Sequence, residues 1–413
     1  MSDTICMKPA AFLLAFIFAL PVRAELTERQ RLEDFDVLWS AIDGGYAYFG
    51  AGRAEWKRVR DALRGKAKAA RTRSDFVAVL EGALQRLRDD SVWISERSTG
   101  SARRVPSETD IWAAWRGDAA VIEAVRTYGE ADVAGVRPGH VVRSIAGLPA
   151  PVAVRDRVGK AEKGAEARNW ALRHALAGPP QGILKLEIAE ARGPKAFEVE
   201  RAPPHAPNGM PLIARRIGEK RDIGYMRLKA SLPDAALPGA FEGAMQYLGA
   251  TRAMILDLRD MTGPFENAGR ARAMTLAILQ RFAKRPGPWQ VRESKAGERT
   301  ADAIAPKAGA YPSPLVVLVD RWTAGEGEAL AAGLRAVGGA RFVGTPMAGL
   351  HGEPREVRLP HSAIAVRFPG ERALLPDGTP REALKPDVPV DLAAPQGGPG
   401  DPILYQGLRL LEK

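Results

Sequence analysis

The sequence predicts an α/β core preceded by a helical N-terminal domain and a β-rich module. Three observations lead to this prediction. Apolar residues recur at helical spacing between Thr27 and Leu87. Between Ser107 and Pro203, short β-like runs alternate with glycine and proline turns. Beyond Gly209, apolar strands alternate with helical patterns, which is typical of an α/β core.

The elements of the predicted core follow one another as strands and helices. We expect strands at Ile223–Leu228, Ala253–Leu258 and Leu315–Val319 and helices at Ala240–Leu248, Ala268–Phe282 and Glu326–Val337. Proline and glycine near Pro203–Pro211 mark a linker. The expected parts are a signal at 1–24, a helical domain at 25–105, a β-rich module at 106–205, a core at 206–393 and a tail at 394–413.

The first 24 residues have the order of a cleavable secretory signal. Lys8 precedes an uncharged apolar run from Ala10 to Leu20, and small residues follow up to Ala24. We therefore expect cleavage near Ala24 and a secreted or periplasmic protein. The apolar run is about eleven residues long, whereas a membrane span needs about twenty, so no transmembrane segment is expected.

Composition excludes several classes of function. The formal charge is +11, but lysine and arginine are spread through every segment and no nucleic-acid motif is present, which indicates a solvated basic surface. The one cysteine, Cys6, lies inside the signal, so neither a thiol nucleophile nor a disulfide is expected. The histidines lack paired carboxylates and the glycine-rich segments lack a phosphate-loop lysine, so we expect no metal and no cofactor.

Several separated strings resemble one known family. They are Ile255–Gly263, Leu318–Ala324 with the helix after it, Phe342–Gly349, and Lys385–Val390. In this order they resemble the strand, nucleophile turn, helix and closing segment of the C-terminal-processing (tail-specific) serine peptidases. The resemblance implies a core related to the ClpP and crotonase folds, and it implies a PDZ-like module for the β-rich segment.

The PDZ-like resemblance rests on the segment from Ala134 to Val142. It looks like the glycine-containing loop with which PDZ modules of bacterial proteases begin their peptide groove, although histidine replaces the usual aspartate. Such modules take an extended peptide as an added strand and receive its terminal carboxylate on loop amides. The resemblance therefore implies peptide binding by Gly135, Val136, Gly139 and His140. A simple hairpin turn is the alternative.

The family's nucleophile and base are missing from the matching positions. Gly325 stands where the family carries its serine, and glycine has no side chain that can form an acyl-enzyme. The place of the family's lysine base is held by Leu350, and the place of the histidine that other members use is held by Ser91. The resemblance also implies oxyanion donors at the amides of Gly263 and Glu326, since Pro264 has no N–H.

Few residues are available as substitutes. Thr323 is a weak candidate nucleophile, because in the family its hydroxyl fixes the turn. Ser91 with His351 as base would invert the usual pair, and we favour instead a loop serine and an unrelated exposed histidine. Glu326 and Glu328 suit the first turn of a helix. As a functional residue, Glu326 would repel a substrate carboxylate.

Three hypotheses follow for function. The leading one is an exported member of this serine-type peptidase family that binds extended or unfolded polypeptide, with a C-terminus as one option, and that has lost serine proteolysis. The second is an active peptidase with a relocated nucleophile at Ser91 or Thr323. The third is a PDZ-type adaptor or scaffold. The oligomeric state is not predicted.

Overall fold

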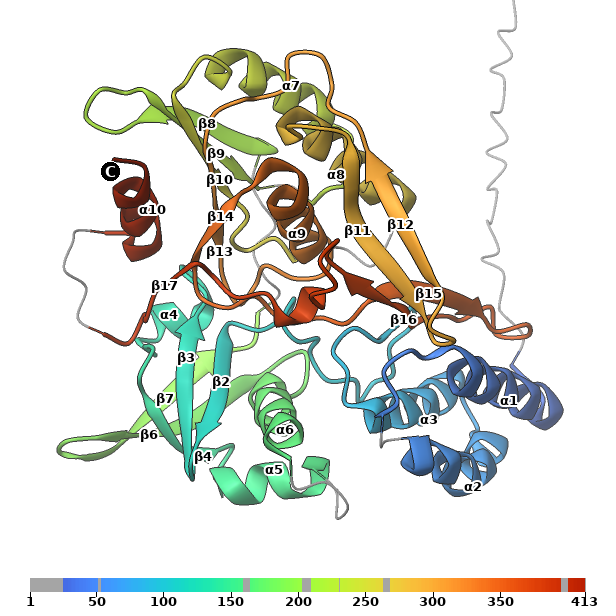
Figure 1. Cartoon of the computed structure of the whole chain (residues 1–413). Coiled ribbons are helices and arrows are strands. Elements are labelled where there is room, and N and C mark those ends of the chain that lie inside the picture. Colours follow the sequence, from blue (N-terminus) through green and yellow to red (C-terminus); the bar gives the residue numbers. More distant parts are fainter. Residues whose placement is uncertain are drawn as a thin grey trace, which may run out of the picture.

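Figure 1 shows a helical part, a β-rich module and a larger core that contacts both. The computed structural model describes residues 25–50, 53–158, 164–202, 209–229, 231–262, 268–394 and 400–412. The expected signal at 1–24 lies outside this range. Among the helices within it, none has the length and apolar character needed to cross a bilayer.

The helical part consists of three helices and one short 3₁₀ turn. These are α1 (Glu28–Gly45), α2 (Arg53–Ala69), α3 (Arg73–Leu84) and η2 (Gln85–Leu87). Thr27 and Thr72 begin α1 and α3 with capping boxes, which satisfy amides that a helix start leaves free. The helices bury Phe35, Trp56 and Phe76 in a shared core. The helical domain predicted from the apolar spacing is therefore present.

The β-rich module is a sheet with two longer helices beside it. Its elements are β2 (Ile111–Arg116), β3 (Ala119–Val125), α4 (Glu130–Val133), β4 (Val141–Ile145), β5 (Leu148–Pro149), α5 (Ala150–Val158), α6 (Ala165–Ala177), β6 (Ile183–Glu190) and β7 (Gly193–Glu200). The strands pair antiparallel in the order β2-β3-β4-β6-β7, with β5 on β4. Strand β2 lies at the edge of this sheet, and α6 packs beside it.

The core is built on a six-stranded mixed sheet in the order β17-β14-β13-β10-β9-β8. Its strands are β8 (Leu212–Ile217), β9 (Ile223–Leu228), β10 (Ala253–Asp257), β13 (Leu315–Val319), β14 (Arg341–Gly344) and β17 (Val388–Pro389). All neighbours are parallel except β8 and β9. Every residue of β10 and β13 is buried, as expected for central strands covered on both faces. The three strands predicted for the core are confirmed.

Helices cover both faces of this sheet (Figure 1). On one face lie α7 (Leu237–Leu248), α8 (Ala268–Phe282) and α9 (Glu326–Gly338), and on the other lies α10 (Pro402–Glu412). Neighbouring residues of β10 alternate, so that Met254 packs towards α7 to α9 and Ile255 towards α10. The three helices predicted for the core are confirmed, although α7 begins at Leu237 rather than Ala240.

A third sheet, which the sequence did not predict, joins the helical part to the core. Its strands are β1 (Trp93–Ile94), β11 (Gly287–Ser294), β12 (Arg299–Ile304), β15 (Glu353–Arg358) and β16 (Ala365–Leu374). The order is β1-β16-β11-β12, and β15 also pairs with β16. Because β1 comes from the end of the helical part, the loop before it is brought against the core.

Candidate active site

The turn between β13 and α9 has room for a side chain at its centre but carries none. Gly325 has φ 54° and ψ −104°, a left-handed conformation that favours glycine. A sharp, strained strand-to-helix turn is the usual place for an exposed catalytic serine. A Cβ added at Gly325 would meet only Cδ1 of Leu350, at an ordinary 3.9 Å. Leu350, expected at the base position, therefore lies next to Gly325.

Thr323 supports this turn from inside the protein. Its side chain is completely buried, its hydroxyl donates to the carbonyl oxygen of Leu258 at 3.0 Å, and it accepts from the Asp320 amide at 3.0 Å. Thr323 does not line the cavity described below. The hydroxyl is thus committed to holding the turn, which is the role expected for it in the family.

Glu328 fixes the segment that faces the turn. This fully buried carboxylate accepts from the amide of Gly325 at 2.9 Å, from Gly349 at 2.7 Å and from Leu350 at 3.1 Å. Burial raises the pKa of Glu328 to about 7, although the charge of Arg381 and the three amides oppose that rise. One side chain in the first turn of α9 therefore positions both Gly325 and the loop that carries Leu350.

A cavity of about 580 Å³ lies beside Gly325. This volume falls within the range of small-ligand sites in proteins. The walls come from the first turn of α9, from α8, and from strands β11, β15 and β16 of the third sheet. Polar residues from distant parts of the sequence meet there, among them Ser91, His351, Glu326 and Arg367.

The structure corrects the expectation that Ser91 and His351 are unrelated. The Ser91 hydroxyl accepts from the backbone amide of His351 at 2.6 Å, and both residues line the cavity. They meet because the loop after η2 is drawn to the core by the pairing of β1 with β16. Ser91 and His351, the two residues of the inverted pair that the sequence left as a weaker option, are therefore neighbours in the fold.

A carboxylate orients the imidazole of His351. Asp89 Oδ2 lies 3.0 Å from His351 Nδ1 and also accepts from the Tyr46 hydroxyl at 2.6 Å, while the ring of Tyr48 stacks on the imidazole at 4.1 Å. Burial lowers the pKa of His351, but the hydrogen bond and charge of Asp89 outweigh burial, so that the pKa lies above its ordinary value. An imidazole held through Nδ1 by a carboxylate is the orientation that a general base requires.

The nucleophile–base contact is not preformed, however. Ser91 bonds to the His351 backbone, and within the described ranges no hydrogen bond joins its hydroxyl to the imidazole. A serine is activated by a direct hydrogen bond to its base. In this structure the His351 imidazole is oriented by Asp89, but no serine or threonine hydroxyl of the described residues forms a hydrogen bond with the imidazole.

Glu326 differs from the expected helix-start charge. It lines the cavity, and its Oε2 atom is buried without a hydrogen-bond partner among the described residues. Burial raises the pKa of Glu326 to about 8, against the opposing charge of Arg367. At neutral pH the group is mostly an uncharged acid. A protonated Glu326 would not repel a substrate carboxylate, which is the functional role that the sequence had left open for an ionised glutamate.

The arginines around the cavity differ in how fully they are paired. Arg292 is bound to Asp302 and Glu371, and Arg381 is bound to Glu353. Arg272 lies 3.0 Å from Asp302. Arg367 donates through Nε to Glu356 at 2.7 Å and lies over the ring of Trp93. No residue in the described part of the chain accepts from the two terminal nitrogens of Arg367.

Of the two predicted oxyanion donors, only Glu326 lies within the described residues. Its amide is the first of α9 and donates to no described acceptor, as is usual at a helix start. Gly263 lies outside the described range. The neighbouring strand ends are aligned, because Thr262 forms a parallel bridge with Ala324, whose amide donates to the Met261 carbonyl oxygen.

The predicted peptide-binding loop of the β-rich module uses its amides internally. Gly135, Val136, Gly139 and His140 donate to the carbonyl oxygens of Asp132, Ala131, Ile122 and Arg137, respectively. Val136 is fully buried, and both glycines have positive φ. A backbone donor of edge strand β2 is also used within the module, because the amide of Trp115 donates to the side chain of Asn169 on α6 at 2.8 Å.

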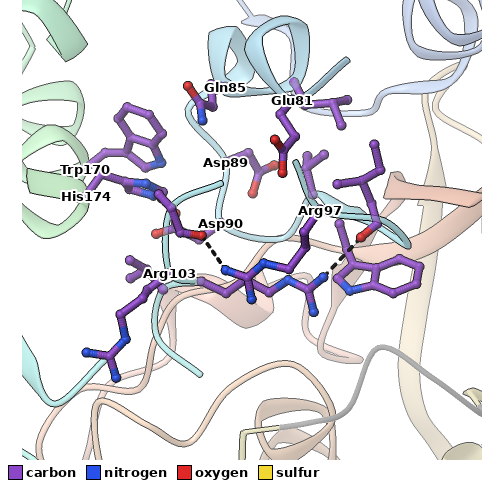
Figure 2. Close-up of a pocket in the computed structure, with 15 residues that line it drawn as sticks. Glu81, Gln85, Asp89, Asp90, Arg97, Arg103, Trp170 and His174 are labelled. Atoms are coloured by element: carbon purple, nitrogen blue, oxygen red, sulfur yellow. Dashed lines mark hydrogen bonds and ion pairs between the residues drawn. The ribbon is translucent and has the colours of Figure 1, made fainter. Parts of the chain in front are cut away.

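A smaller pocket lies where α6 meets the end of the helical part (Figure 2). Asp90, next to Asp89, places Oδ1 2.7 Å from Nε2 of His174 and Oδ2 3.5 Å from a terminal nitrogen of Arg173. The ring of Trp170 stacks on His174 in the same view. Residues 89 to 91 therefore contact both the β-rich module and the cavity of the core.

Sequence reasoning missed Asp89 and Arg367 as parts of the site. Asp89 stood in the string that was compared with the family's histidine motif, so a search for a carboxylate partner of His351 could have found it. Arg367 had no such signal, because its strand was not predicted.

Comparisons with known proteins agree on the fold. Residues 222–390 match the sequence model of peptidase family S41. A search of curated proteins finds no match to the chain. Mature CPAF superimposes with a TM-score of 0.59 at 16% identity, over 93% of this chain and 95% of that one.

Two further solved structures are similar over nearly their whole length. The photosystem II D1 C-terminal processing protease gives a TM-score of 0.57 at 18% identity, covering 93% of this chain and 97% of that chain. A putative peptidase from Parabacteroides merdae gives a TM-score of 0.52 at 15% identity, over 94% of this chain and 97% of that chain. At these identities the likeness shows a shared fold. It extends over the helical part and the β-rich module as well as the core.

Proposed function

Because the chain belongs to peptidase family S41 through residues 222–390, we propose that it binds extended polypeptide in the cavity beside Gly325 without forming an acyl-enzyme there. The observation that carries the proposal is the turn itself. It keeps the strained backbone and the open space of a nucleophile turn, yet it has no hydroxyl at its centre. Binding can persist in such a site, whereas attack on a carbonyl by this residue cannot.

The test combines a covalent probe with a binding assay on the mature chain. We expect no labelling by a fluorophosphonate and no cleavage of an unfolded protein, together with measurable binding of that protein. Gly325→Ser is the informative variant, since the added side chain has space and His351 is already oriented by Asp89. Labelling of Gly325→Ser but not of Gly325→Ala would show that the turn and the oriented His351 can still activate a serine at this position. Absence of polypeptide binding by the natural chain would overturn the proposal.

A relocated nucleophile is the second candidate, and one observation favours Ser91 over Thr323. Ser91 lines the cavity, and its hydroxyl accepts from the backbone amide of His351. Thr323 is buried, and its hydroxyl donates to the carbonyl oxygen of Leu258. Rotation of the Ser91 side chain towards the imidazole would be required. Cleavage by the natural chain that is lost in both Ser91→Ala and His351→Gln, with the fold preserved, would establish this candidate against the first.

Two further parts of the proposal concern location and the β-rich module. We propose that the mature protein is exported, on the pattern of residues 1–24. The loop containing Gly135 and Gly139 is proposed as a second peptide contact. Since its amides donate internally, such binding would need the loop to rearrange.

A further inference from the structure

We propose that a small monovalent anion, a halide such as chloride, binds between the buried side chains of Arg103 and Arg201, where the β-rich module joins the rest of the chain. Arg103 lies in the segment that enters the module before β2, and Arg201 follows β7 at the exit from it. The site shares no lining residue with the cavity beside Gly325, and it does not depend on the proposed function.

Both arginines are buried charges. Arg103 is 7% exposed and Arg201 is 8% exposed, although arginine is usually a surface residue. Burial lowers the pKa of both guanidinium groups, and the positive charge of Arg103 lowers the pKa of Arg201 further. Figure 2 shows the guanidinium of Arg103 directed away from Asp89 and Asp90. Because a buried charge is costly unless an opposite charge lies beside it, one counter-ion would stabilise both side chains.

The described part of the chain does not supply that counter-ion. No carboxylate within it forms an ion pair with either guanidinium. The negative charges of Asp110 and Glu108 act on Arg103 from a greater distance. Glu108 is bound to Arg97 at 2.7 Å, and Asp110 lies 3.9 Å from Arg126. Both nearby carboxylates are therefore matched by other arginines.

Hydrogen bonds to carbonyl oxygens fix the two side chains without neutralising them. Nη2 of Arg103 donates to the carbonyl oxygen of Ala202 at 2.9 Å. Nε of Arg201 donates to that of Ala177 at 3.1 Å, and Nη1 donates to that of Ile183 at 3.2 Å. Nε and Nη1 of Arg103 and Nη2 of Arg201 donate to no acceptor among the described residues. Each guanidinium is thus held in place and keeps a donor for a ligand.

Gly178 allows the Arg201 guanidinium to lie at the end of α6. Its φ of 58° is a left-handed value that favours glycine, and a Cβ added there would clash with Nη2 of Arg201. The carbonyl oxygens at a helix C-terminus carry partial negative charge and stabilise one cation. The charge of Arg103 then remains without compensation, so a singly charged anion matches the site.

The size of the space selects a single atom. The cavity that both arginines line has a volume of about 10 Å³, which is close to the room that one water molecule needs. Its other walls are mostly apolar, and they include Ile111, Leu176 and Leu184. Phosphate, sulfate and carboxylates have several heavy atoms and exceed this volume, whereas a water molecule would leave both charges uncompensated. A halide has one atom, carries one negative charge and accepts hydrogen bonds from guanidinium groups.

A bound anion connects the entry and the exit of the β-rich module. The amide of Arg103 donates to the carbonyl oxygen of Gly178 at 2.8 Å, and the amide of Arg201 donates to that of Gly182 at 2.9 Å. Both connecting segments therefore already lie against the loop that follows α6. An ion shared by the two guanidinium groups adds a contact that exists only in the folded chain, so the halide stabilises the fold by mass action.

The first experiment compares salts at constant ionic strength on the full mature chain. Thermal unfolding is followed in sodium chloride, bromide, acetate and gluconate. The two halides should raise the midpoint by about 2 °C or more relative to gluconate, as expected for a ligand well above its Kd, and acetate should not. Arg103→Gln, which keeps a donor to Ala202, should abolish this halide increment. Arg321→Gln is the matched control, because Arg321 is mostly buried but already paired with Glu123 at 2.7 Å.

The second experiment locates the ion in the natural chain and so does not depend on the folding of a variant. Crystals soaked in sodium bromide should show an anomalous-scattering peak between the guanidinium groups of Arg103 and Arg201. Absence of this peak would overturn the site.

The remaining outcomes of the salt comparison are equally decisive. No halide increment in the natural chain, or an equal increment in Arg103→Gln, would overturn the site. A bromide peak without a halide increment in solution would identify an adventitious ion only and would overturn it as well. Equal protection by acetate would contradict the assignment to a single-atom anion.

Discussion

The loop from Ala134 to His140 and the cavity beside Gly325 satisfy their polar groups in different ways. In the loop, four amides expected to meet a peptide donate to carbonyl oxygens of the same module. At the cavity, the Glu328 carboxylate accepts from the amides of Gly349 and Leu350. Glu326 Oε2 and the terminal nitrogens of Arg367 have no hydrogen-bond partner within the described residues. A buried polar group without a partner is costly, so the comparison favours the cavity over the loop as the proposed binding site.

The largest expected effect tests how the cavity wall is held. In the loop from Ala134 to His140, backbone amides donate to backbone carbonyl oxygens. The amides of Gly325, Gly349 and Leu350 instead all donate to the side chain of Glu328. Glu328→Ala leaves these buried donors without an acceptor and should lower the free energy of unfolding by about 3–5 kcal/mol. Urea denaturation would measure it. Glu326→Ala, in the same helical turn, is the control, and an equal loss in both variants would contradict the assignment.

An intermediate effect concerns pH. The folded-state pKa of Glu326, about 8, lies above its ordinary value of 4.5, so this group favours folding at low pH and that contribution is lost as pH rises towards 8 and beyond. Glu326→Gln should therefore gain stability relative to the natural chain between pH 5 and pH 9, by on the order of 2 kcal/mol. Glu328 titrates in both proteins, so the difference isolates Glu326. A difference that does not change with pH would show that Glu326 is ionised throughout.

The smallest expected effect tests the loop. Gly139 has φ +87°, and an added Cβ would lie 3.1 Å from that of Ala393. Gly139→Ala should cost about 1–2 kcal/mol of stability and change the affinity for an unfolded polypeptide by less than about threefold. Gly147→Ala has similar backbone strain without a close neighbour and serves as the control. A large loss of affinity in Gly139→Ala alone would move the peptide site to the loop.

The fold was predicted best where apolar residues show the period of the element. Helix α8 has the predicted bounds Ala268–Phe282, and the central strands are fully buried on both faces. The third sheet was missed because its strands carry charges that pair across the sheet. Arg292 on β11, for example, bonds to Asp302 on β12 and Glu371 on β16. Such internal pairs hide the alternation of apolar and polar residues on which strand prediction depends.

The site was predicted in its positions but not in its contacts. Gly325, Leu350 and Ser91 were located by local strings. The contact of Ser91 with His351 spans 260 positions and depends on the pairing of β1 with β16, which no local string contains. The protonation of Glu326 follows from burial, so it too required the folded chain.

The three consecutive residues Asp89, Asp90 and Ser91 have a consequence for how this architecture can be divided. Asp89 and Ser91 bind His351 of the core, and Asp90 binds His174 of the β-rich module. Excising the helical part, or replacing it with that of a distant relative, would remove partners from both neighbours at once. The three parts should therefore melt in one transition and exchange poorly between homologues, so that they form one unit of inheritance.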